Sequence, residues 1–184
     1  MCQKITTNLL IFFFIIMTSQ AFANPVFIDN FQDSTKWTYI ADDVMGGVSK
    51  GSITYAIDAG QPVAILSGNV STENNGGFIQ VRRSMRGMDL KAAQAVRIVA
   101  KGNNEKYFIH LRTNRMFMPW QYYQAEFVVE ETYKEFILPI SAFEKSGFFI
   151  PSTIVPDTII SLGFVAFGRD HQAELHVKEI GFVE

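Results

Sequence analysis

Residues 42–51 of the sequence, DDVMGGVSKG, join two adjacent carboxylates and a glycine pair to an alternating segment. Asp42 and Asp43 could bind a metal ion, or the glycines could hold a phosphate. Calcium loops place carboxylates at alternating positions, and neighbours on a strand point to opposite faces, so the spacing argues against a metal site. A phosphate loop opens a helix, whereas Gly46 and Gly47 lead into a strand-like segment. We interpret the stretch as a tight turn held by aspartate hydrogen bonds to the backbone.

Beyond this turn, apolar and polar residues alternate with a period of two, and turn residues interrupt them every 8 to 12 positions or so, as in an all-β sandwich or barrel. Breaks such as 75–77 and 101–104 are rich in Gly and Asn, which tolerate turn backbone. We expect one short helical turn at 141–144, capped by Ser141. About ten strands are predicted, at 26–31, 48–57, 63–70, 78–83, 95–101, 106–113, 121–130, 134–139, 159–167 and 174–182, in a double-layered sheet.

The first 23 residues have the pattern of an export signal. Lys4 precedes the apolar run 9–17, and residues 21–23, Ala-Phe-Ala, supply a cleavage site between small residues. Removal of 1–23 would leave residues 24–184 as a single domain, with one core of ordinary size. The only cysteine, Cys2, would leave with the signal, so disulfides and thiolate chemistry are not expected. The sequence therefore predicts an exported protein, periplasmic or secreted.

The charge and hydropathy of the expected mature chain narrow its partners further. It carries 15 basic and 18 acidic residues and lacks the basic excess of nucleic-acid-binding proteins. After the signal, no apolar run approaches the roughly 20 residues of a membrane span. We therefore expect no nucleic acid, no membrane span in the mature chain and no cofactor.

Two blocks of the sequence point to a family. The first runs through 37–49, WTYIADDVMGGVS, and the second through 67–78, SGNVSTENNGGF. Together, in this order, they resemble the signature of the complex I intermediate-associated protein 30 family, and the similarity extends over most of 26–184. Within the two blocks, the residues that we assign to a structural signature are Trp37, Asp42, Asp43, Met45, Gly46, Gly47, Asn74, Asn75, Gly76 and Gly77.

The resemblance implies a jelly-roll β-sandwich of the galactose-binding-like type. It also implies action through protein contacts without catalysis, since the family's named mitochondrial member is an assembly factor for respiratory complex I. An exported chain could not take that role on the matrix side. The expected function is therefore an exported, non-catalytic module that binds a protein partner, with a role in complex assembly or as a chaperone. The alternative is a carbohydrate-binding module on the same fold.

Catalytic and metal-binding patterns are weak in this sequence. His110, His171 and His176 show no metal-ligand spacing, and no Gly-x-Ser-x-Gly elbow occurs. We expect no enzyme, although a carboxylate pair that meets only in the fold would make a hydrolase. Asp29 and Glu179 could flank a structural calcium if the terminal strands pair.

Alternation defines a candidate binding face. In the predicted strand 106–113, it separates an apolar set of side chains from an outward set. In the segments around residues 82 and 124, every second side chain likewise points outward. The outward residues are Arg82, Phe108, His110, Arg112, Tyr122, Gln124 and Glu126. Rings that stack, beside forked donors and acceptors that orient a ligand, suit sugar or peptide recognition. The alternative is an ordinary solvated face with cross-strand ion pairs.

One connecting segment is unusually apolar. Residues 115–120, RMFMPW, join two predicted strands, and Trp120 could anchor a partner there. The segment could equally close the end of the sandwich over the core. The stretch 148–151, FFIP, leaves the same two possibilities, with core closure favoured.

Overall fold

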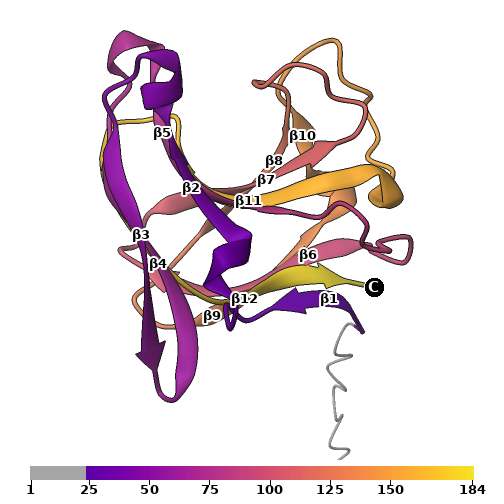
Figure 1. Cartoon of the computed structure of the whole chain (residues 1–184), viewed down its shortest axis with the longest axis horizontal. Helices are drawn as coiled ribbons and strands as arrows, with labels where there is room; N and C mark the ends of the chain where they lie inside the picture. The colour runs from indigo at the N-terminus through magenta and orange to yellow at the C-terminus, as the bar shows by residue number, and fades with distance from the viewer. Residues whose placement is uncertain (1–23) are drawn as a thin grey trace, which may run out of the picture.

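The computed structural model describes residues 24–184, which form two six-stranded antiparallel sheets packed as a sandwich (Figure 1). This arrangement confirms the all-β, jelly-roll prediction. The back sheet contains β3 (Lys50–Asp58), β4 (Gln61–Val70), β12 (His171–Val183), β6 (Ala95–Gly102) and β9 (Lys134–Pro139) in that order, with β1 (Pro25–Asp29) also paired to β12. The front sheet contains β10 (Glu144–Lys145), β8 (Tyr123–Val128), β7 (Lys106–Thr113), β11 (Ile159–Phe167), β5 (Phe78–Ser84) and β2 (Trp37–Ala41).

All ten predicted strands are present, with ends shifted by three residues or fewer. The sequence analysis missed β2 and β10, which are the edge strands of the front sheet. Each pairs with a single neighbour, β2 with β5 and β10 with β8, and neither alternates over enough residues to show a clear period of two. The export signal, at 1–23, lies outside the described residues. Among residues 24–184, no helix is long and apolar enough to cross a membrane.

Helical structure is confined to 3₁₀ turns in the part of the chain that the structure describes. These turns are η1 (Ser34–Lys36), η2 (Asp42–Met45), η3 (Glu73–Asn75), η4 (Ile140–Ala142) and η5 (Pro156–Thr158). The expected turn at 141–144 was misplaced. Ser141 lies inside η4, whose N-cap is Pro139 with no side-chain cap, and Glu144 already belongs to β10.

The core lies between the sheets, and β7 shows how alternation builds it. Tyr107, Ile109 and Leu111 are fully buried, while Phe108 and His110 lie on the outer face and are only partly covered. This matches the predicted division of the strand. Because the outer face of the front sheet is covered by no further layer, it is the surface on which the candidate site is built.

A buried polar cluster joins the first strand to the front sheet. Asp29, at the end of β1, accepts hydrogen bonds from the Phe31 backbone N–H (2.7 Å) and from Trp37 Nε1 (3.0 Å), and it forms an ion pair with Arg83 of β5. Glu179 instead accepts from Arg97 (2.7 Å). Both carboxylates thus pair with an arginine, which disfavours the possibility that they flank a calcium ion.

Candidate functional site

The opening stretch folds around one buried carboxylate. Asp42 is fully buried, and its Oδ1 accepts the backbone N–H of Ser49 (3.0 Å). Its Oδ2 accepts the Ser49 hydroxyl (2.5 Å) and the backbone N–H groups of Gly77 (2.6 Å) and Phe78 (3.2 Å). Burial by itself raises the pKa of Asp42, but these hydrogen bonds outweigh it and hold the pKa below its usual value. The carboxylate thus fastens both blocks of the signature together.

The glycines of the signature allow the chain to approach this carboxylate. A Cβ added at Gly47 would lie 2.4 Å from Asp42 Cγ, and one at Gly76 would lie 2.5 Å from Asp42 Oδ2. Gly46 ends η2 in the left-handed conformation, at φ 88°. We call Asp42, Ser49 and the two glycine pairs 46–47 and 76–77 the aspartate knot.

The remaining signature residues have different positions, and Trp37 lies at the end of β2 away from the aspartate knot. Trp37 is buried against the core, and Asn74 and Asn75 adopt positive φ in η3. Asp43 is exposed and only accepts the neighbouring Val44 backbone N–H (3.0 Å). Met45 is 60% exposed at the tip of the turn. The residues that we assigned to a structural signature thus have different surroundings. Among them, Asp42 is the one that accepts the hydrogen bonds joining the two blocks.

The front sheet brings most of the predicted binding residues into register on its outer face. His110 of β7 is paired with Gln124 of β8 on one side and with Gly163 of β11 on the other, and Gly163 is paired with Arg82 of β5. In the next outward row, Phe108 is paired with Glu126. Glu126 is exposed and forms an ion pair with Lys106 (3.0 Å).

Aromatic rings meet at the centre of this face. His110 stacks on Tyr122 with ring centroids 4.1 Å apart and planes 13° apart. Phe167, which sequence reasoning missed, meets the rings of His110, Tyr122 and Phe108 edge-on at 5.5 to 6.1 Å. Alternation alone could have placed Phe167 outward from β11, but its position beside His110 depends on the order of the strands.

Several polar atoms on the floor of this face have no partner. His110 Nε2, Gln124 Oε1 and Arg112 Nε are enclosed and make no hydrogen bond among the described residues. Burial lowers the pKa of His110 to about 3, so its ring is neutral at physiological pH. A buried polar atom without a partner costs about 1–3 kcal/mol, so these enclosed atoms lower the stability of the folded protein.

Arg112 takes a different place from the one expected. Its guanidinium donates to the backbone carbonyls of Met118 (2.9 Å) and Pro119 (3.0 Å). It therefore holds the apolar 115–120 segment against the end of β7 and has only its Nε left without a partner. Burial, and secondly the charge of Arg82, lower the pKa of Arg112.

The 115–120 segment and the loop after β10 form an apolar rim beside the face. Ser146 joins the two, because its hydroxyl donates to Trp120 O (3.2 Å) and accepts the Tyr122 backbone N–H (3.0 Å). Met116 and Ile150 are buried, so each segment also closes the core, while the side chains between them remain outside. The exposed members of the apolar rim are Phe117 (87%), Met118 (47%), Trp120 (63%), Phe148 (95%) and Phe149 (95%).

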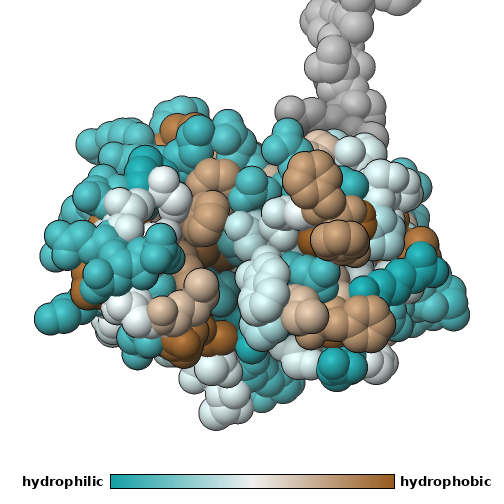
Figure 2. Space-filling model, turned by 90° about the horizontal axis from the view of Figure 1, so that it is seen from above, coloured by the Kyte–Doolittle hydropathy of each residue, from teal (hydrophilic) through white to brown (hydrophobic). Residues whose placement is uncertain are grey.

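The front sheet lies below an opening with a lobe on either side (Figure 1). One lobe carries η2, with Val44 and Met45 exposed, and the other carries the loops around β8 and β10. Seen from above, apolar side chains gather on both sides of a central hollow (Figure 2).

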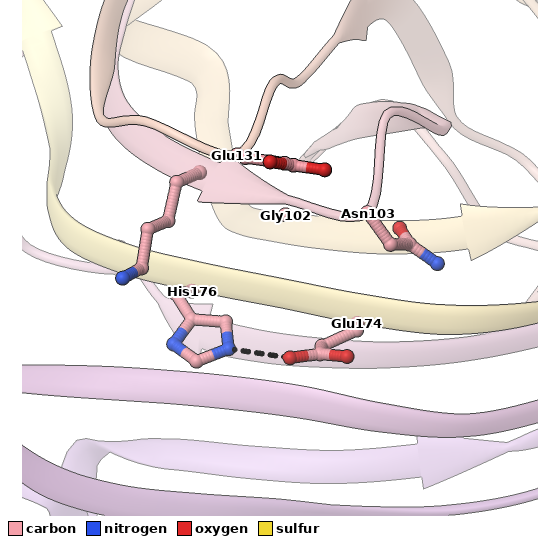
Figure 3. Close-up of a pocket in the computed structure, with 6 residues that line it drawn as sticks. Gly102, Asn103, Glu131, Glu174 and His176 are labelled. Carbon is pink, nitrogen blue, oxygen red and sulfur yellow. Dashed lines mark hydrogen bonds and ion pairs between the residues drawn. The ribbon is translucent and has the colours of Figure 1, made fainter.

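Two further hollows lie away from this face. One, of about 320 Å³, is lined by polar residues that include Asn103, Glu131, Glu174 and His176, and His176 Nε2 lies 3.1 Å from Glu174 Oε1 (Figure 3). Its strands, β6 and β12, belong to the back sheet. The other, of about 500 Å³, lies beside the aspartate knot, between β2 and β3. Among residues 24–184, no three side chains of His, Cys, Asp or Glu gather as metal ligands.

The two antiparallel sheets define a jelly-roll β-sandwich. The family model for complex I intermediate-associated protein 30 matches residues 25–177. The chain therefore belongs to the complex I intermediate-associated protein 30 family. A comparison with curated proteins gave no match.

Solved structures share the fold at low sequence identity. The family 11 carbohydrate-binding module of the cellulosomal cellulase Lic26A-Cel5E of Clostridium thermocellum is 15% identical, with a TM-score of 0.68 over 84% of this chain and 91% of that module. The family 11 module from the same organism in complex with a β-1,3-1,4-mixed-linked tetrasaccharide is also 15% identical, with a TM-score of 0.67 over 84% of this chain and 92% of that module. A family 30 carbohydrate-binding module is 13% identical, with a TM-score of 0.53 over 74% of this chain and 92% of that module.

Proposed function

We propose that this protein is a non-catalytic binding module whose front-sheet face binds a carbohydrate. The observation that carries the proposal is the aromatic surface formed by His110, Tyr122 and Phe167, with the polar Gln124 in register beside His110. Sugar hydroxyls both donate and accept, so they would pair with polar side chains of this face, while the apolar face of a sugar ring would lie on the aromatic surface.

The dimensions of the face agree with this proposal. From Arg82 to Gln124 the row crosses three strand spacings, or roughly 14 Å, which accommodates a short oligosaccharide. The family 11 module bound to a tetrasaccharide supports the proposal only through its fold, because the sequences are too different to match residues. The aromatic surface beside a polar side chain is the reason that we propose a carbohydrate before a protein partner, in the reverse of the order that the sequence favoured.

A second function is favoured by a separate observation, the apolar rim. Phe117, Phe148 and Phe149 are almost fully exposed, and clustered apolar side chains of this kind mark surfaces that bind proteins. The family description, which refers to association with an intermediate of complex I, agrees with a protein partner. In this second proposal the protein assists the assembly of a complex outside the cytoplasm, as an exported periplasmic or secreted factor.

One experiment separates the two proposals. The purified protein is applied to a glycan array, and the same preparation is used for a pull-down from an envelope extract. Gln124→Ala removes a floor acceptor, while Phe148→Ala with Phe149→Ala removes the tip of the apolar rim.

If a carbohydrate is the ligand, Gln124→Ala weakens glycan binding about tenfold, and the double variant binds glycans as the wild type does. If a protein is the partner, the double variant loses it and Gln124→Ala retains it. Absence of glycan binding by a folded wild-type protein would overturn the first proposal.

A further inference from the structure

Charge is distributed unevenly along the front-sheet face. Among residues 24–184, the cations of the face that lack an ion pair are Arg82 of β5 and Arg112 of β7, whereas Lys106 of β7 pairs with Glu126. Its carboxylates, Glu126 and Glu144, lie on β8 and β10. Glu144 is paired in register with Gln124, so the row that begins at Arg82 ends at a carboxylate. The face is therefore polarised rather than uniformly charged.

Arg82 is a half-buried cation without a counter-ion. No carboxylate lies within 4.0 Å of its guanidinium among residues 24–184, whereas Arg83, Arg97 and Arg169 are all in ion pairs. Arg112 is close enough for the charge of Arg82 to lower its pKa, after the larger effect of burial. Two neighbouring cations with no anion between them disfavour each other, and an anionic group placed beside them would relieve this.

The residue next to Arg82 in the row is a glycine. Gly163 lies between Arg82 and His110 in register, and a Cβ added to it would lie 3.0 Å from the Val81 backbone oxygen. The Arg82 and His110 backbones are two strand spacings, or about 10 Å, apart, with β11 between them. A guanidinium in this setting offers a planar pair of donors, which matches the two oxygens of a carboxylate.

We propose that the carbohydrate bound on this face is acidic, and that the carboxylate of a uronic acid residue binds Arg82 on the outer face of β5. This inference rests on the proposed function, since it names the ligand class of the same face. Glu126 is neutralised by Lys106, but Glu144 has no ion pair among the described residues. The acidic sugar therefore lies over β5 and β7, and the residue that follows it over β8 and β10 is neutral.

The test begins with an array that holds neutral, uronic-acid-containing and sulfated oligosaccharides. Titration calorimetry then compares the best uronic-acid-containing oligosaccharide with its carboxyl-reduced form, in which each acid is converted to a neutral alcohol. Arg82→Gln removes the cation, and Lys91→Gln is the matched control, because Lys91 is an exposed cation in the turn between β5 and β6.

We expect the carboxyl reduction and Arg82→Gln each to weaken binding about tenfold or more, and Lys91→Gln to leave it unchanged. The two losses should not add, because both remove the same contact. Equal binding of neutral and acidic oligosaccharides, or binding of sulfated ones alone, would overturn the inference and leave carbohydrate binding in place. No binding to any oligosaccharide would overturn both.

Discussion

Replacement of Asp42 by Asn tests the aspartate knot directly. The change keeps the size of the side chain and removes its charge. Oδ2 accepts three hydrogen bonds and Oδ1 accepts one, and the donors are three backbone N–H groups and the Ser49 hydroxyl. An amide NH₂ in either position faces a donor, so at least one buried N–H or O–H group loses its acceptor, and the other bonds lose the contribution of the charge.

The magnitude follows from these contacts. An unsatisfied buried donor costs about 1–3 kcal/mol, and a hydrogen bond to a charged group is worth roughly 1 kcal/mol more than a neutral one. With three bonds weakened and one lost, we expect the free energy of unfolding to fall by about 4–6 kcal/mol. For a protein of this size, that lowers the melting temperature by roughly 8–24 °C.

The assay is thermal unfolding of the wild type and two variants, Asp42→Asn and Asp43→Asn. The control removes the same charge from an exposed neighbour that accepts a single local hydrogen bond, so its cost should stay below about 1 kcal/mol. If the two variants melt within about 2 °C of each other, the reasoning about the aspartate knot is wrong.

The pH dependence gives a second readout of the same residue. Since the pKa of Asp42 is lowered in the folded state, its contribution is fully present above the unfolded value of about 3.9 and is lost as pH falls through the lower folded value. The wild type should lose stability over that acid range more steeply than Asp42→Asn does.

Three further predictions follow from other parts of the structure. Gly47→Ala should lower the melting temperature, because the added Cβ would overlap the buried carboxylate of Asp42. Gly147→Ala should leave the melting temperature unchanged, because open space surrounds that position, and differential scanning fluorimetry of the two variants checks this. Arg83→Gln should cost about 3–5 kcal/mol in chemical denaturation by leaving Asp29 buried without its counter-ion, and a cost below about 1 kcal/mol would contradict that account. The pKa of His110 is lowered to about 3, so below about pH 6.5 the unfolded chain takes up a proton that the folded chain does not. The free energy of unfolding should therefore fall from about pH 6.5 to about pH 4, and it should fall less steeply in His110→Phe. An equal slope in the two proteins would count against a neutral His110.

The parts of the fold that the sequence predicted are those set by local alternation. In β7, each residue's face follows from its neighbours, so the buried and outward sets were predicted correctly. The edge strands β2 and β10 were missed because one is short and irregular and the other has two residues. Domain boundaries at 24 and 184 stay a prediction.

The candidate site depends on contacts between distant parts of the chain, and there the sequence was less informative. The pairing of Arg82 with Gly163 follows from the position of β11 between β5 and β7, which no local pattern shows. Likewise, the sequence placed an aspartate beside a glycine pair but could not show that Asp42 reaches Gly77, 35 residues later. Arg112 resembled a ligand contact until the structure placed carbonyls of the next loop against its guanidinium.

The family signature and the candidate site are separate parts of one molecule. The aspartate knot fixes the end of β2 and the starts of β3 and β5, so it builds one lobe beside the face. Arg82, His110 and Gln124 lie outside both signature blocks, on strands whose outer face packs against no other element. Residues that hold a scaffold can be shared by proteins that bind different partners, since function resides in the site rather than in the fold. Membership of the complex I intermediate-associated protein 30 family therefore concerns the scaffold, whereas the ligand that we propose depends on the residues of the front-sheet face.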